Sequence, residues 1–106
     1  EIESSTEFQE YELSLQENVD ETLRLIIMAQ TSFYKRDVNQ ALEYVNKSLS
    51  IYETAQGYAL KGSLHYLNGD KGEAQKNWAK ATRFNPDIYI PEIEALDQII
   101  KTELGD

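Results

Sequence analysis

The chain has 106 residues, a hydrophobic fraction of 41% and a charged fraction of 27%, which suit one soluble folded domain. It contains no cysteine, so disulfides, thiolate nucleophiles and cysteine-based zinc sites are excluded. Its net charge of −9 argues against nucleic acid and anionic membrane surfaces as partners, because both attract basic patches. The longest apolar run, residues 25–29, is far shorter than a transmembrane helix of ~20 residues, so we expect no membrane insertion.

The compartment is left open by the sequence. A chain without cysteine suits an oxidising or a reducing space, so the cytoplasm and the periplasm both remain candidates. Because the chain begins with Glu1 rather than Met, we expect an expressed fragment or a processed product, from which an upstream signal or anchor could have been removed.

The acidic side chains are concentrated at the N-terminus. Residues 1–21 hold eight acidic side chains and no basic one, whereas the rest of the chain carries 11 acidic and 10 basic side chains. Within residues 1–18, Phe8, Tyr11 and Leu15 recur at helical spacing, which predicts a short amphipathic helix or an acidic tether. We therefore separate residues 1–18 from the body of the domain.

Two helices are predicted next, over residues 21–54. The first, roughly residues 19–35, begins at Asn18, with Glu21 three residues later as in a capping box. The second starts after Asp37, with Gln40 three residues on, and runs to about residue 52. Its apolar residues form one stripe and its polar residues the opposite face. The expected buried stripe is Ala41, Leu42, Val45 and Leu49, and the expected exposed residues are Glu43, Asn46, Lys47 and Ser50.

A second pair of helices is predicted over residues 55–87. Residues 68–70 read Asn-Gly-Asp, a turn sequence that separates the two helices. Asp70 caps the later helix, with Glu73 reaching back, and this helix stops near Phe84, before the Asn-Pro-Asp sequence of residues 85–87. A last helix, about residues 90–103, follows, and Pro91 fits its first turn. Its predicted inner residues are Ile93, Leu96, Ile99 and Ile100.

The two helix pairs repeat each other at an offset of 33 residues. Ala29 aligns with Gly62 and Ala41 with Ala74, so small residues fall on small residues twelve positions apart in both pairs. The further matches are Phe33 with Tyr66, Asp37 with Asp70, Val45 with Trp78, Lys47 with Lys80 and Ser48 with Ala81. Small residues at these places indicate that helices approach closely there.

This pattern resembles the tetratricopeptide repeat over about residues 20–103. The second pair carries most of the signature positions, namely Tyr58, Gly62, Ala74, Trp78, Ala81 and Pro86. The first pair matches more loosely, since Glu53 stands in place of the closing proline. In the second pair, His65 stands where the family usually has tyrosine. The resemblance implies an all-α fold, a right-handed α-solenoid of antiparallel helix pairs with a C-terminal capping helix at residues 88–106. A generic helical bundle with accidental self-similarity is the alternative.

The resemblance also implies that the first helix of each pair lines a concave groove. The expected groove wall consists of Leu23, Ile26, Ile27, Gln30, Phe33, Tyr34, Ala59, Ser63, Tyr66, Leu67, Ile93 and Asp97, with Ile90 beside them. An apolar wall with a few hydrogen-bonding groups favours an amphipathic helix or an extended apolar segment as ligand. Some members of the family bind the acidic C-terminus of a partner with lysines and asparagines in the groove. We do not expect that mode of binding here, because no lysine occupies the inward positions 26, 30, 59, 60 and 63.

We therefore predict a protein–protein interaction module, an adaptor or scaffold that binds a protein or peptide. The alternative is a structural role, in which the N-terminal segment fills the groove of its own chain or of a second copy. The domain would then form a homo-oligomer or belong to a larger, envelope-associated assembly.

No enzyme and no cofactor are expected. The sole histidine, His65, falls at a predicted core position, which leaves no base for a nucleophile. Residues 68–73 lack the third oxygen ligand of a calcium loop, and no glycine-rich phosphate loop is present.

Overall fold

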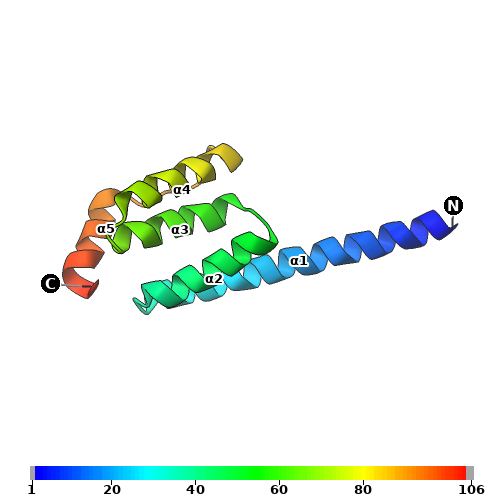
Figure 1. The fold of residues 1–106 in the computed structure, drawn as a ribbon, viewed down its shortest axis with the longest axis horizontal. Coiled ribbons are helices and arrows are strands. Elements are labelled where there is room, and N and C mark those ends of the chain that lie inside the picture. Colours follow the sequence, from blue (N-terminus) through cyan, green and yellow to red (C-terminus); the bar gives the residue numbers. More distant parts are fainter. Residues whose placement is uncertain (1, 105–106) are drawn as a thin grey trace.

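Five α-helices follow one another along the chain. The computed structural model describes residues 2–104, and no strand occurs within them. The helices are α1 (Ile2–Tyr34), α2 (Val38–Ile51), α3 (Ala55–Leu67), α4 (Lys71–Phe84) and α5 (Ile93–Ile99), followed by a π-helical turn, Ile100–Leu104. Helices α1 to α4 lie beside one another in chain order, and α5 packs against α3 (Figure 1). The prediction of an all-α fold is confirmed.

The turns after α1 and α3 are built in the same way. Arg36 and Gly69, 33 residues apart, each adopt a positive φ, of 64° and 86°. In both turns the amide of this residue donates to the carbonyl three residues earlier, at 2.9 and 3.0 Å. The following amide, which belongs to an aspartate, donates to the carbonyl five residues earlier at 2.9 Å. The repeat in the sequence therefore recurs in the backbone geometry of the two turns.

The predicted caps of α2 and α4 are present. The side chains of Asp37 and Asp70 accept hydrogen bonds from the amides of Gln40 and Glu73, each at 3.1 Å. The reciprocal bond predicted from the Glu73 carboxylate is absent, because the amide of Asp70 already donates to the carbonyl oxygen of His65 near the end of α3. One half of the predicted capping box is therefore wrong.

Helix α1 is longer than the sequence indicates. The start predicted at Asn18 is wrong, since one helix runs from Ile2 to Tyr34 and is ~50 Å long. Its N-terminal half extends beyond the other helices (Figure 1), which gives the molecule a length of 64 Å against 26 and 18 Å in the other directions. The prediction of a separate short helix depended on Phe8 and Tyr11, whose side chains lie outside the part of the chain whose side chains the structure describes.

Deleting residues 1–17 should leave the folded body intact. The side chains that the structure describes in this segment, those of residues 9, 10 and 12–17, are all exposed to solvent, so their removal costs little packing. We expect the thermal unfolding midpoint, followed by circular dichroism, to shift by less than about 4 °C, which corresponds to roughly 1 kcal/mol. A fall of three times that size would contradict the view that the body folds independently of this segment.

The core runs between successive helices, from α1 to α4, and includes Leu96 of α5. The small residues Ala29, Ala41 and Ala74 are completely buried there. At Gly62, a Cβ atom would stand 2.5 Å from Trp78 Nε1 and 3.0 Å from the carbonyl oxygen of Ala74. The close contact predicted between α3 and α4 is therefore confirmed. On α2, Ala41 and Val45 are buried, and the remaining two residues of the predicted stripe, Leu42 and Leu49, are half-buried.

The last helix begins later than predicted. It starts at Ile93, so Pro91 precedes the helix instead of lying in its first turn. A proline disfavours helical geometry in the residue before it, and Ile90 accordingly belongs to an extended segment. Of the predicted inner residues, Leu96 is 1% exposed and Ile93 is 49% exposed, so the inward placement of Ile93 is wrong. Ile99 and Ile100 are half-buried.

Candidate functional site

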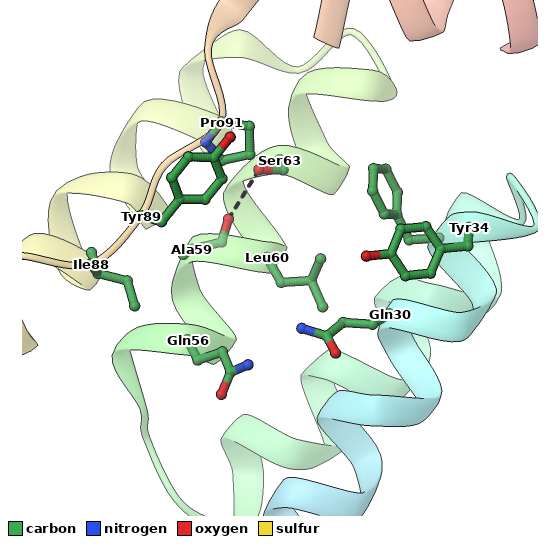
Figure 2. Close-up of a pocket in the computed structure, with 10 residues that line it drawn as sticks. Gln30, Tyr34, Gln56, Ala59, Leu60, Ser63, Ile88, Tyr89 and Pro91 are labelled. Carbon is green, nitrogen blue, oxygen red and sulfur yellow. Dashed lines mark hydrogen bonds between the residues drawn. The ribbon is translucent and has the colours of Figure 1, made fainter. Parts of the chain in front are cut away.

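A cleft of about 370 Å³ opens between α1, α3 and the extended segment that follows α4. In Figure 2, α3 forms its floor, α1 one wall and residues 88–91 the opposite wall. The residues that line it are Gln30, Phe33, Tyr34, Gln56, Ala59, Leu60, Ser63, Ile88, Tyr89 and Pro91.

The lining is mostly apolar and carries no acidic, basic or histidine side chain. Two side-chain amides, of Gln30 and Gln56, offer both donors and acceptors. The hydroxyl of Ser63 is already occupied, because it donates to the carbonyl oxygen of Ala59 at 3.2 Å, as the dashed line in Figure 2 shows. Tyr34 and Tyr89 are 74% and 75% exposed. This surface can bury apolar groups and form a few hydrogen bonds, but it offers no charge to pair with a charged ligand.

Local sequence signals hold the floor and the far wall in place. The side chain of Thr54 accepts a hydrogen bond from the amide of Gly57 at 3.0 Å, which begins α3. Residues 56, 59, 60 and 63 then fall on one face of α3, at helical spacing. Beyond α4, Ile88 and Ile90 pack against the cluster that contains Tyr58, so the extended segment is fastened to α3.

The residues of the predicted groove wall lie in different surroundings in the structure. Five of its residues line the cleft: Gln30, Phe33, Tyr34, Ala59 and Ser63. Three are buried in the core and do not line the cleft, so their placement on an open wall is wrong: Ile26, Tyr66 and Leu67. Three more are exposed but do not line the cleft: Leu23, Ile27 and Ile93. The physical reason is that α1 and α3 are apolar around most of their circumference, so periodicity alone could not separate the buried face from the open one.

Tyr66 and Asp97 hold the last helix in place. The Tyr66 hydroxyl donates to Asp97 Oδ1 at 3.0 Å, which joins α3 to α5. The Tyr66 ring stacks on Trp78 with a centroid distance of 5.8 Å. Burial, together with the bond to Asp97, raises the pKa of Tyr66, so its hydroxyl keeps its proton at neutral pH and can act as the donor. Both residues were predicted to face a partner, and the structure places them in this internal contact.

Several lining residues were not predicted as groove wall: Gln56, Leu60, Ile88, Tyr89 and Pro91. Gln56 lies three residues before Ala59, so helical spacing contained the signal for it. Leu60 was named in the sequence analysis only as one of the inward positions that hold no lysine. For Ile88 and Tyr89 the sequence held no comparable signal, because an extended segment that crosses a helix has no periodicity of its own.

The described part of the chain contains no group of three or more histidine, cysteine, aspartate or glutamate side chains that could hold a metal ion. His65 is half-buried. No helix within residues 2–104 combines the length and the apolar character needed to cross a membrane. Comparisons of this chain with protein-family models, with curated proteins and with solved structures found no match.

Proposed function

We propose that this protein is an interaction module of the tetratricopeptide type, which binds a segment of a partner protein in the cleft. In this proposal, α1–α2 and α3–α4 are two stacked repeats of a right-handed solenoid, and α5 caps the end. The two turns with matching hydrogen bonds support a repeated unit. The cleft lies on α1 and α3, the first helix of each pair.

One observation carries the proposal: an open, uncharged and mainly apolar cleft with two exposed tyrosines at its rim. Tyrosine supplies a large contact area with little conformational freedom to lose, which is why it is frequent in protein interfaces. A charged ligand group would lose hydration here without finding a counter-charge. The partner segment should therefore present apolar side chains to the cleft, with Gln30 and Gln56 bonding to its backbone.

Replacing Tyr34 and Tyr89 together with alanine should remove most of the binding. We expect the affinity for a partner segment to fall about tenfold or more, because two anchoring rings are lost from the rim. The partner segment can be selected from a random peptide library displayed on phage, and its affinity then measured by fluorescence anisotropy.

The matched control is Tyr52→Ala, since Tyr52 is also exposed but does not line the cleft. It should bind the selected peptides as the unaltered protein does. If Tyr52→Ala weakened binding as much as the double substitution, or if no peptide bound at all, the cleft would not be the binding site.

A structural role through the N-terminal segment was the alternative. The N-terminal half of α1 leads away from the body (Figure 1), so in this structure it does not fill the cleft of its own chain. The alternatives in which the segment engages a second copy, or places the domain in a larger assembly, remain proposals, and a concentration-dependent dimer in sedimentation experiments would support the first of them.

A further inference from the structure

Helix α1 carries a second apolar surface, on its solvent-exposed side. Leu13, Leu23, Ile27 and Tyr34 are exposed by 64%, 46%, 61% and 74%. They occupy positions of a single heptad register, in which 13, 20, 27 and 34 are a positions and 16, 23 and 30 are d positions. We call these seven residues the α1 ridge: Leu13, Gln16, Asp20, Leu23, Ile27, Gln30 and Tyr34.

The ridge lies outside the buried core of the domain. Among the α1 side chains that the structure describes, the buried ones are those of Thr22, Leu25, Ile26, Ala29 and Ser32, and none of them belongs to the ridge. An a/d seam on a straight helix is the surface into which the side chains of a second helix pack. From position 13 to position 34 the ridge is ~32 Å long, which matches a partner helix of ~20 residues.

The charges beside the ridge favour a basic partner. Its N-terminal half is flanked by Glu10, Glu12 and Glu17, all exposed. The nearest basic residue, Arg24, is already paired with Glu21 at 2.6 Å. A second copy of this helix would bring two acidic segments together, which is repulsive, whereas a basic helix would be attracted.

Asp20 strengthens this argument, because it lies in the seam itself. Its carboxylate accepts a hydrogen bond from the side-chain amide of Gln16 at 2.9 Å. When a second helix covers this position, the carboxylate loses water and needs an opposite charge to compensate. A lysine or arginine on the partner helix would supply that charge and would fix the register of the pair.

We propose that the α1 ridge binds a basic amphipathic helix of a partner protein as a two-stranded helical pair, with a cationic side chain opposite Asp20. The ridge meets the cleft at Gln30 and Tyr34. The inference goes beyond the proposed cleft function, because residues 13–27 lie outside the cleft and pair with a helix whether or not the cleft is filled.

The test uses two synthetic peptides of about 21 residues. Both carry leucine at a and d, with one central a position left for a charged residue. The first has lysine at that position and at e and g, and the second has glutamate in the same places. Fluorescence anisotropy with the full chain should show binding of the lysine peptide, weakened about tenfold between roughly 50 and 500 mM salt, and no binding of the glutamate peptide. Equal binding of both peptides, or of neither, would overturn the proposal.

Substitutions on α1 then locate the contact. Leu13→Gln and Ile27→Gln should each weaken binding of the lysine peptide about tenfold, because each removes an apolar contact from the seam. Asp20→Asn should reduce the salt dependence. The matched control is Leu15→Gln, since Leu15 is a 40% exposed leucine about 200° around the helix from Leu13. All four side chains are exposed, so the helical circular dichroism spectrum should not change.

Two further results separate this inference from its alternatives. Tyr89→Ala, which alters only the cleft, should leave binding of the lysine peptide unchanged. The proposal for the ridge and the proposal for the cleft are therefore tested independently. If Leu15→Gln weakened binding as much as Leu13→Gln, the partner would use another face. A dimer of the free protein that Leu13→Gln dissociates would assign the ridge to a second copy. Either outcome would overturn the proposal.

Discussion

Replacing Gly62 with valine is expected to destabilise the domain by about 2–3 kcal/mol. The new Cβ atom would stand 2.5 Å from Trp78 Nε1 and 3.0 Å from the Ala74 carbonyl oxygen, so α3 and α4 must separate or the indole must move. Moving the indole is costly, because Trp78 Nε1 donates to the carbonyl oxygen of Ala59 at 3.2 Å and the ring stacks on Tyr66. The thermal unfolding midpoint should fall by roughly 10–20 °C, measured by circular dichroism.

Gly72 provides the control for this substitution. It lies in the first turn of α4, and the nearest atom to a Cβ built there is an Asp70 carboxylate oxygen at 3.9 Å. Gly72→Ala should therefore be neutral or stabilise the domain by up to about 1 kcal/mol, because alanine has the higher helix propensity. If Gly62→Val melted at the same temperature as Gly72→Ala, α3 and α4 would not be in the close contact described here.

Leu96→Ala should have the second large effect, a loss of about 2–4 kcal/mol. Leu96 is 1% exposed and joins the main core, whereas the other inward contacts of α5 are only half-buried. Without this side chain, the C-terminal helix is held by the half-buried Ile99 and Ile100 and by the hydrogen bond from Tyr66 to Asp97. Because residues 88–91 directly precede α5 and form one wall of the cleft, the substitution should also weaken peptide binding. Urea unfolding followed by tyrosine and tryptophan fluorescence measures the first effect, and anisotropy measures the second.

Ile93→Ala tests the same helix at an exposed position. With half of its surface in solvent, Ile93 should contribute less than about 1 kcal/mol to stability. Similar losses for Ile93→Ala and Leu96→Ala would mean that α5 packs with a different face against α3.

Much of the fold could be predicted from local sequence signals. The caps at Asp37 and Asp70, the turn at residues 68–70 and the end of α4 near Phe84 are confirmed. Each depends on a hydrogen bond or a backbone angle that a few neighbouring residues determine. The contact at Gly62 was also predictable, because only small residues allow two helices to approach so closely.

The candidate site could be predicted only in part, and the errors have a common cause. Asn18 and Glu21 have the spacing of a capping box, but the same spacing also occurs inside a continuous helix. These two residues therefore could not show that α1 begins at Ile2. Ile26 and Ile27 are adjacent and equally apolar, yet one is 2% and the other 61% exposed.

The sequence by itself determined where most helices begin and turn, because hydrogen bonds within a few residues decide those features. Only the tertiary structure decided which apolar side chains are buried and which are open. Burial depends on neighbours distant in the sequence: α5 covers Tyr66, and the extended residues 88–91 complete the cleft over α3.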